Sequence, residues 1–501
     1  MHTIVVKSLR YTAIDKELFQ NIDFILNGND RIALIGENGV GKTTLMKILA
    51  GQLEFDSGNL VKEDWINCEL ISQDFSGDLD KTVIDYLDKI DAFDKAIHLM
   101  QKMGFDLGKN QNKLNLKLRD LSGGERRIVE LSITINSNSY FLFIDEPENH
   151  LSIRARFVLC ETLKSYWGGV VIVSHDRFII NSFSNKIIEI EDKKTRSFKG
   201  SFEDYQEYRA KLKFGEIRDW EEKKKLIARM KETLPMLRRK AEVNSAAAGT
   251  YQQKKRRYEE LCQSIGERPE SDRSSMKIQI AEVEKKNGKI IAKLEDFTFG
   301  YPNQPILFKD CETTILFGEK VALVGNNGVG KTTLIKLLTG ELEPNKGVAK
   351  LGVNIKIGNF EQHNNFGDFE DKNAIYYLQY ILNLDEPKAC SVLARILFNR
   401  TEMLKPISML SGGQRTRLRM SVLFGQNPEL IILDEPTNNL DITSWDFLVE
   451  SLNEFTGSMI LISHDKDFVE AVSDRIFYLH DKMIQEWFGD FDDLIQNMLI
   501  N

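Results

Sequence analysis

The sequence predicts an α/β fold in which two copies of one domain are joined by a helical hairpin. Three observations predict it. A set of short motifs occurs twice at one constant spacing, apolar runs alternate with helical patterns in both copies, and a segment rich in lysine and arginine separates the copies. Repetition at a fixed step indicates that one structural unit has been duplicated.

Four motifs make the duplication visible. Each motif of the first copy returns 289 residues later, with no net insertion between motifs in either copy. The pairs are GENGVGKTT at Gly36–Thr44 and GNNGVGKTT at Gly325–Thr333, LSGGE at Leu121–Glu125 and LSGGQ at Leu410–Gln414, DEPENHLS from Asp145 and DEPTNNLD from Asp434, and VSHD at Val173–Asp176 and ISHD at Ile462–Asp465. We therefore expect a first domain over residues 1–199, a linker over 200–289 and a second domain over 290–501.

Apolar runs in each copy predict a buried parallel sheet. RIALIG and KVALVG precede the two glycine loops, and YFLFIDEP, GVVIVSHD, LIILDEP and SMILISHD end in acidic residues or histidine. Such runs between helical patterns indicate parallel strands with crossover helices. Ligands of these sheets bind at the carboxyl ends of the strands, which is where the polar residues fall.

The linker has a different composition. From about Glu203 to Ile265 it is rich in charged residues, Leu and Ala, with apolar residues at helical spacing. We expect one helix that Pro235 kinks, a turn over Ala241–Thr250 and a returning helix. Between Arg229 and Arg257 nine basic residues outnumber two acidic ones, a net charge of +7.

Composition excludes several classes of protein. The net charge is −8, so general electrostatic binding to nucleic acid is not expected of the whole chain. The five cysteines form no C-x-x-C pair, which argues against zinc and iron–sulfur sites and fits a reducing, cytoplasmic location. We expect no signal peptide and no membrane-spanning segment.

The glycine loops match the pattern G-x-x-x-x-G-K-T, which binds phosphate. The backbone N–H groups of such a loop and the start of the next helix surround phosphate oxygens. We expect Lys42 and Lys331 to reach the β- and γ-phosphates, and Thr43 and Thr332 to hold Mg²⁺. The expected nucleotide-binding residues of the loops are Gly36, Glu37, Asn38, Gly39, Val40, Gly41, Lys42, Thr43, Thr44, Gly325, Asn326, Asn327, Gly328, Val329, Gly330, Lys331, Thr332 and Thr333.

Acidic pairs follow a second buried strand in each copy. Asp145 and Asp434 are expected to help bind Mg²⁺, and Glu146 and Glu435 to polarise the attacking water. Solvated carboxylates at strand ends are the alternative, and the identical spacing from each glycine loop argues against it.

Three further pairs are candidates. His175 and His464 favour contact with the γ-phosphate or the catalytic water, and Gln73 and Gln362 are expected to sense Mg²⁺ and water. Tyr11 and Tyr301 are candidates for stacking on adenine. Their spacing is 290 rather than 289, and the alternative is that either tyrosine belongs to the core.

The two LSGG motifs, which we call the signature motifs, complete a known pattern. Each copy resembles an ABC-type ATPase in the order of its motifs, which is the glycine loop, the glutamine, LSGG, the acidic pair and the histidine. The resemblance implies two P-loop ABC-type nucleotide-binding domains that face head to tail and enclose two ATP molecules. Ser411, Gly412 and Gly413 would then close the first site, and Ser122, Gly123 and Gly124 the second.

Two such domains on one chain with a charged helical linker resemble the F subfamily of these ATPases. The sequences DEPTNNLD at Asp434–Asp441 and SHDR at Ser174–Arg177 are typical of this subfamily. The resemblance implies a monomer that closes on ATP, binds the exit (E) site of the ribosome, extends its linker toward the peptidyl-transferase centre and is released by hydrolysis. Its partners would be 23S ribosomal RNA and transfer RNA, and its role either a translation factor or antibiotic protection of the ribosome.

The basic linker residues are the expected RNA contacts, because Lys and Arg neutralise phosphates. They are Arg238, Arg239, Lys240, Lys254, Lys255, Arg256 and Arg257. The alternative for this charge run is a solvated helix face. The interval from Gln73 to Leu121 equals that from Gln362 to Leu410, so the first domain has no room for the extra arm of some F-subfamily members.

Two residues depart from the family pattern. Glu148 and Ser152 stand in the first copy where the second has Thr437 and Asp441, so we expect unequal turnover at the two sites. Outside the F subfamily, the alternatives are the tandem ATPase subunit of an ABC importer, which has no reason for a basic hairpin, and a DNA-repair or structural-maintenance ATPase. The latter carry zinc modules or long coiled coils, and the sequence predicts neither.

Overall fold

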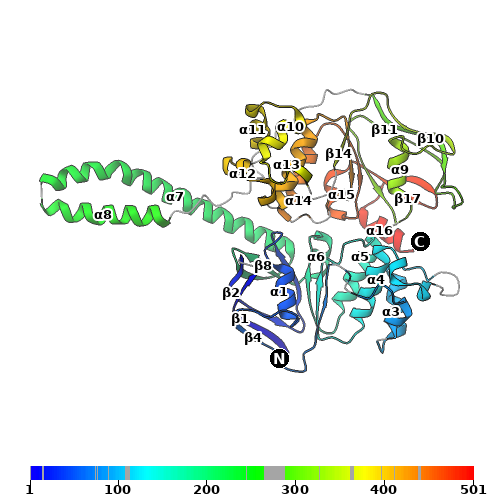
Figure 1. Ribbon diagram of the computed structural model, residues 1–501, viewed down its shortest axis with the longest axis horizontal. Coiled ribbons are helices and arrows are strands. Elements are labelled where there is room, and N and C mark those ends of the chain that lie inside the picture. Colours follow the sequence, from blue (N-terminus) through cyan, green and yellow to red (C-terminus); the bar gives the residue numbers. More distant parts are fainter. Residues whose placement is uncertain are drawn as a thin grey trace. The chain divides into compact units, whose positions relative to one another are not determined.

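The computed structural model describes most of the chain. The residues outside the description are 1, 14–15, 74, 76, 89, 108–112, 244, 265–287, 327, 361–365, 397, 411, 438–439, 441 and 501. The chain divides into two compact units, one of Met1–Ser201 with Ile278–Asn501 and one of Phe202–Lys277. The first unit contains both copies of the repeat, which we call the first half and the second half (Figure 1).

A six-stranded sheet forms the centre of the first half. Its spatial order is β5 (Cys68–Ile71), β6 (Phe141–Asp145), β7 (Gly169–Val173), β3 (Arg31–Gly36), β8 (Lys186–Glu191) and β9 (Lys194–Lys199). The first five strands are parallel and β9 is antiparallel. A separate antiparallel sheet has the order β2 (Lys16–Asn27), β1 (Thr3–Ala13) and β4 (Ser57–Val61).

Helices cover both faces of this sheet. They are α1 (Lys42–Leu49), α2 (Val83–Leu87), α3 (Phe93–Lys102), α4 (Gly123–Ile135), α5 (Ile153–Lys164) and α6 (Arg177–Phe183), with a 3₁₀ turn at Leu118–Asp120. One buried cluster joins α1 to the antiparallel sheet, and another joins α3, α4 and α5 to the opposite face. The fully buried residues of β6 and β7 lie between them, as the apolar runs predict.

The second half repeats this architecture. Its sheet has the order β14 (Ile357–Phe360), β15 (Leu430–Asp434), β16 (Ser458–Ile462), β12 (Lys320–Val324), β17 (Arg475–His480) and β18 (Met483–Trp487), and its antiparallel sheet is β11 (Phe308–Leu316), β10 (Ile290–Phe299) and β13 (Lys346–Leu351). Its helices are α9 (Lys331–Leu338), α10 (Ala374–Leu382), α11 (Glu386–Arg395), α12 (Arg400–Leu404), α13 (Gly412–Gly425), α14 (Ile442–Glu454), α15 (Lys466–Val472) and α16 (Phe491–Ile500), with 3₁₀ turns at Gly367–Phe369 and Ile407–Met409. The prediction of two α/β nucleotide-binding-type domains is confirmed.

The two halves pack against each other within their unit. Ile153 of α5 belongs to the same buried cluster as second-half residues such as Leu448, and Phe157 packs against that cluster. Arg177 of α6 lies over the ring of Trp445, 3.8 Å from its centroid, and pairs with Asp446. The start of α5 and α6 therefore forms part of the contact between the halves.

The linker forms the predicted helical hairpin. Helix α7 (Phe202–Val243) has 42 residues, α8 (Ser245–Ser264) has 20, and the two lie side by side (Figure 1). The predicted turn over Ala241–Thr250 is wrong in extent, because α7 continues to Val243 and α8 begins at Ser245. A run of alanines, the strongest helix former, extends α8 toward the turn. Pro235 lies inside α7 and does not end it.

Candidate functional sites

The two glycine loops adopt the same conformation. Gly41 and Gly330 precede α1 and α9, both with φ of 105°, in the left-handed region that favours glycine. A Cβ at Gly41 would come within 2.8 Å of the Phe19 ring, and one at Gly330 within 2.9 Å of Phe308. Glycine is therefore required by conformation and by space at both loop ends.

Each loop lysine points back over its own loop. The Nζ of Lys42 donates to the carbonyl oxygens of Gly36 (2.7 Å) and Glu37 (3.1 Å). The Nζ of Lys331 donates to the equivalent carbonyls, at 2.8 and 3.2 Å, and burial lowers its pKa to about 8. A concave set of backbone N–H groups with an ammonium beside it is an anion site.

The loop threonines meet the strand-end aspartates. Thr43 Oγ1 donates to Asp145 Oδ2 at 2.5 Å, and Thr332 Oγ1 to Asp434 Oδ2 at 3.4 Å. Burial raises the pKa of both aspartates, and the neighbouring threonine and lysine oppose that shift. One hydroxyl and one carboxylate per site suit Mg²⁺, which prefers oxygen ligands and retains water and phosphate oxygens. Among the described residues no cluster of three or more His, Cys, Asp or Glu could hold a metal by itself.

The glutamates after these aspartates have strained backbones. Glu146 and Glu435 have φ of 43° and 47°, and each N–H donates at 2.8 Å to the last residue of the neighbouring strand, Val173 or Ile462. Left-handed residues other than glycine are uncommon and concentrate at functional sites. Burial raises the pKa of both carboxyls, and that of Glu435 reaches about 7. Such a pKa suits a group that exchanges a proton near neutral pH.

The first-half glutamate has amide partners. Glu146 Oε2 accepts from Gln73 Nε2 at 2.9 Å and from Asn149 Nδ2 at 3.0 Å. His175 Nε2 lies 3.9 Å from the other carboxylate oxygen. The predicted residues Gln73, Glu146 and His175 are therefore brought together.

The second-half glutamate has different partners. His464 donates its backbone N–H to Glu435 Oε2 at 3.3 Å, and its Nε2 lies 3.5 Å from Oε1. The same Nε2 lies 3.4 Å from Lys331 Nζ. Burial first, then the charges of Lys331 and Arg156, lower the pKa of His464 well below 6.5. A neutral imidazole has one acceptor nitrogen, which can receive a hydrogen bond from the ammonium of Lys331.

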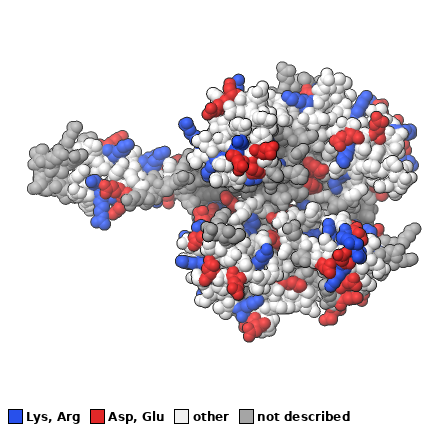
Figure 2. Space-filling model, in the orientation of Figure 1, with Lys and Arg blue, Asp and Glu red and all other residues white. Residues whose placement is uncertain are grey.

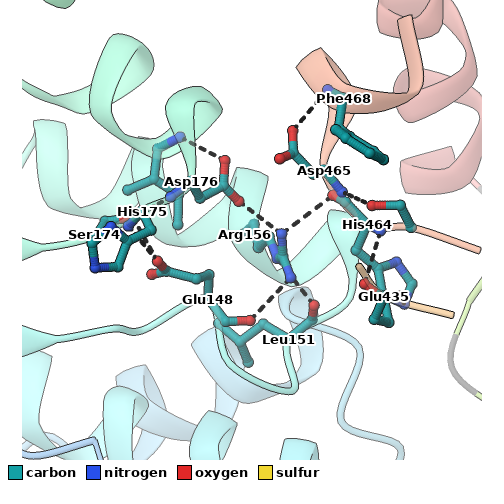
Figure 3. A network of polar contacts seen from close by, with 12 residues as sticks. Glu148, Leu151, Arg156, Ser174, His175, Asp176, Glu435, His464, Asp465 and Phe468 are labelled. Carbon is teal, nitrogen blue, oxygen red and sulfur yellow. Dashed lines mark hydrogen bonds and ion pairs between the residues drawn. The ribbon is translucent and has the colours of Figure 1, made fainter. Parts of the chain in front are cut away.

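Glu148 causes this difference between the halves. Its Oε1 accepts from Ser174 Oγ and from the backbone N–H of His175, both at 2.8 Å (Figure 3). In the second half Thr437 stands in its place, and the equivalent histidine N–H goes to Glu435. Ser152, the other predicted departure, accepts the N–H of Ala155 at the start of α5, whereas Asp441 lies outside the described residues.

A cavity of about 590 Å³ joins the two halves at the second glycine loop. Its walls include Ser122, Gly123, Gly124, His150, Leu151 and Arg156 of the first half and Tyr301, Lys331, Thr332, Thr333, Asp434, Glu435 and His464 of the second. The LSGG signature of one half thus faces the glycine loop of the other, as the resemblance implies. Tyr301 lines this cavity and contacts Thr333 Oγ1 at 3.2 Å.

The counterpart at the first glycine loop is only partly described. Ser411, which is expected to close this site, falls outside the described residues, and Gly412 and Gly413 begin α13. Asn327 and Gln362, which are expected at the second site, also fall outside the described residues. Tyr11, on β1, packs on Phe19 with ring centroids 6.3 Å apart. Closure of the first loop by Ser411, Gly412 and Gly413 therefore stays a prediction.

Sequence reasoning missed two buried arginines. Arg127 donates to the carbonyl oxygens of Ser72 and Asp145, both at 2.6 Å, and so ties α4 to two strand ends. Arg156 forms hydrogen bonds with both halves. Each stands where the other copy has an uncharged residue, Thr416 and Trp445. Both positions differ in charge between the copies, but so do other matched positions such as Arg119 and Ser408, so this signal alone does not single them out.

A glycine loop joined to an acidic pair at the next strand end is the machinery of a P-loop ATPase, and this chain carries it twice. The family model described as "ABC transporter" matches residues 19–149 and 308–438. Both matched ranges contain a glycine loop and an acidic pair.

Several relatives match almost the whole chain. The ATP-binding protein Uup of Buchnera aphidicola (subsp. Schizaphis graminum) is 30% identical over 96% of this chain and 82% of its own length. YdiF of Bacillus subtilis (strain 168) is 28% identical, with 95% and 79% covered, and YheS of Escherichia coli (strain K12) is 28% identical, with 98% and 81% covered. The chain belongs to the ABC transporter family, as a tandem ABC ATPase of the Uup, YheS and YdiF type, the ABC-F subfamily, and its domains hydrolyse ATP.

Solved structures share the fold. An archaeal ribosome recycling factor, in complex with the ribosomal stalk protein aP1, matches with a TM-score of 0.65 at 19% identity, over 98% of this chain and 92% of that one. The protein titled RNase-L Inhibitor matches with a TM-score of 0.63 at 17% identity, over 98% and 93%. Within the described part of this chain, none of the helices combines the length and apolar character needed to cross a membrane.

Proposed function

We propose that this ATPase is a cytoplasmic, monomeric ribosome-binding protein. ATP with Mg²⁺ binds between the halves and closes them, and the closed form binds the ribosomal E site with the hairpin directed toward the peptidyl-transferase centre. Hydrolysis releases it. The observation that carries this proposal is the basic helical hairpin that connects the two ATPase halves in the sequence.

The residues at the second site support a specific mechanism of ATP hydrolysis. Lys331 binds the β- and γ-phosphates, and Glu435 orients the attacking water and takes up its proton. Thr332 and Asp434 would hold Mg²⁺, which neutralises charge on the phosphate oxygens when bound. Ser122 and Gly123 of the other half line the opposite wall of the cavity, where they would face the γ-phosphate. Because one chain supplies both walls, no second subunit is needed.

The hairpin has the dimensions and charge for contact with RNA. At a rise of about 1.5 Å per residue, the 20 residues of α8 extend roughly 30 Å. Lys254, Lys255, Arg256 and Arg257 of α8 are exposed, and cations of this kind neutralise phosphates. Figure 2 shows basic and acidic side chains interspersed along the described part of the hairpin. The three remaining predicted contacts, Arg238, Arg239 and Lys240, lie on α7, and their side chains are outside the description.

Fold-level similarity supports the choice of partner. The structural neighbour named above is, by its title, a ribosome recycling factor. At 19% identity this is an analogy of fold, and the hairpin carries the argument for a ribosomal partner in this chain.

Ribosome trapping tests the proposal. A Glu146→Gln/Glu435→Gln protein, which keeps nucleotide binding but lacks both proposed bases, is expected to sediment with ribosomes in ATP. The wild-type protein in ADP is the control and is expected to stay free. If the double variant also sediments free of ribosomes in ATP, the ribosomal function is wrong.

A second experiment separates the two roles within this function. Expression in a susceptible host, followed by growth on lincosamides, pleuromutilins, macrolides and phenicols, distinguishes them. Raised resistance assigns the protein to protection of the ribosome, and unchanged resistance assigns it to general translation.

A further inference from the structure

Arg156 is a buried cation that bonds to both halves. It lies in α5 of the first half with only 5% of its surface exposed. Its Nη1 donates to Asp176 Oδ2 at 2.7 Å and to the carbonyl oxygen of His464, in the second half, at 3.3 Å (Figure 3). Its Nε and Nη2 donate to the carbonyls of Leu151 (3.2 Å) and Glu148 (3.1 Å). Four hydrogen bonds fix the guanidinium, which leaves it little freedom to move.

Carboxylates of both halves surround this guanidinium. Burial lowers the pKa of Arg156, but Asp176, Glu435, Glu148 and Asp465 together raise it above its usual value. Two of these acids belong to each half. Arg156 therefore stays charged and stabilises negative groups on both sides of the contact.

The residue that Arg156 reaches in the second half belongs to the second ATP site. The backbone N–H of His464 donates to Glu435, and its ring lies beside Lys331. The hydrogen bond from Arg156 to the carbonyl oxygen of His464 therefore restrains the segment that carries this backbone N–H and this ring. Arg156 also lines the composite cavity itself.

Within the described residues, the second half makes no equivalent contact with the first half. Trp445 stands at the position equivalent to Arg156 and donates its Nε1 proton to Asp465 at 2.8 Å, which is its own half's equivalent of Asp176. An indole is neutral and has one donor, so it cannot bond to its own aspartate and also to the other half. Glu146 has Gln73 and Asn149 as its amide partners instead.

We infer that Arg156 is a positioning residue for the second ATP site. It holds His464 and Glu435 from across the contact between the halves, and among the described residues it has no equivalent at the first site. It acts through the His464 segment and by its charge. The inference rests on the proposed roles of Glu146 and Glu435 as catalytic bases, and it assigns the unequal sites to a specific side chain.

The test measures each site separately in ribosome-free protein. In a Glu146→Gln background, turnover comes from the second site, and there Arg156→Gln is expected to lower kcat about 10-fold or more with a much smaller change in KM for ATP. In a Glu435→Gln background, turnover comes from the first site, and Arg156→Gln is expected to change kcat by less than about twofold. Arg156→Lys, which restores the charge, should recover part of the lost kcat.

A variant that removes both charges guards against a simple folding defect. Arg156→Met/Asp176→Asn removes the guanidinium together with the carboxylate that pairs with it at 2.7 Å, and asparagine still caps α6 as Asp176 does. It should show the same loss confined to the second site. Equal losses in both backgrounds, or no loss in either, would overturn the inference.

Failure of the proposed catalytic role of Glu435 can be distinguished from failure of the inference about Arg156. If Glu435→Gln alone leaves turnover unchanged, the catalytic role of Glu435 is wrong, whatever Arg156 does. Because no ribosomes are present, the outcome also does not depend on the proposed ribosomal partner.

Discussion

Glu148 accepts the backbone N–H of His175 at 2.8 Å, and this bond distinguishes the two ATP sites. In the second half the equivalent N–H of His464 goes to Glu435 itself, at 3.3 Å. A substitution two residues beyond Glu146 therefore redirects a hydrogen bond away from the glutamate proposed to activate water. The histidines occupy matched positions and do not have matched partners.

The first prediction concerns the cost of burying Glu148. Burial, and next the charge of Asp176, raise its pKa from 4.5 to about 7, and its Oε2 has no hydrogen-bond partner among the described residues. Between these pH values the folded protein binds a proton that the unfolded chain has lost. The free energy of unfolding should therefore fall by up to about 3 kcal/mol as pH rises from about 4.5 to 7, and this contribution should be constant above 7.

Glu148→Gln tests this pH dependence. The amide keeps an acceptor for Ser174 and His175 and removes the ionisation. Urea unfolding from pH 5 to 8, followed by tryptophan fluorescence, should show the variant gaining stability over the wild type as pH rises. Glu148→Thr, which copies the second half, should show the same trend. Parallel curves for wild type and variants across this range would contradict the prediction.

The second prediction separates helix stability from nucleotide binding at Gly123. This residue is the first of α4, and a Cβ there would meet nothing closer than the His150 ring at 3.5 Å. An aspartate in a first helical turn stabilises by roughly 0.3–1 kcal/mol. In the cavity wall, however, its carboxylate would repel the phosphates of ATP bound to Lys331.

Gly123→Asp should therefore keep or raise Tm while reducing ATP hydrolysis. We expect a loss of about 10-fold or more at the second site, measured in a Glu146→Gln background, because like charges brought together cost several kcal/mol. The same substitution in a Glu435→Gln background is the matched control, with a small expected effect. A loss of equal size there would mean that the signature does not serve the opposite loop.

The strand–loop–helix units could be predicted from sequence because their chemistry is local. The glycines before Lys42, the polar residues at the strand ends and the apolar runs each indicate structure within a few residues. Arg156 could not be predicted in this way. Its partner His464 lies 308 residues away, and nothing near Arg156 in the sequence indicates the contact. The hairpin turn was overestimated because its alanines were assigned to a loop despite their helix propensity.

The third prediction concerns Mg²⁺. Thr43 with Asp145 and Thr332 with Asp434 offer a hydroxyl and a carboxylate that suit the ion only when phosphate oxygens and water complete the coordination. ATP with Mg²⁺ at about 100 times its Kd should raise the free energy of unfolding by about 2.7 kcal/mol for each occupied site, and ATP with EDTA by clearly less. Thermal unfolding measures both.

Asparagine substitutions at the aspartates supply the control for the metal. In Asp145→Asn/Asp434→Asn the difference between the two conditions should shrink toward zero, because the proposed anionic ligands are gone. A stabilisation by ATP that is insensitive to EDTA in the wild type would show that these oxygens do not hold Mg²⁺.

The last prediction concerns the hairpin. Lys255 and Arg256 lie one turn before Glu259 and Glu260, at 3.8 and 2.9 Å, whereas Lys254 and Arg257 have no ion pair with any described residue. The latter two should contribute most to RNA binding, since their charges are not partly neutralised. Lys254→Gln/Arg257→Gln should weaken ATP-dependent ribosome binding and reduce the slope of log K against log salt by about 1 for each phosphate that the variant no longer neutralises. Lys223→Gln/Lys225→Gln removes the same charge from exposed positions of α7 farther from the turn, and it should leave the slope nearly unchanged. If both pairs reduce the slope equally, the effect is one of net charge, and α8 makes no specific contact with RNA.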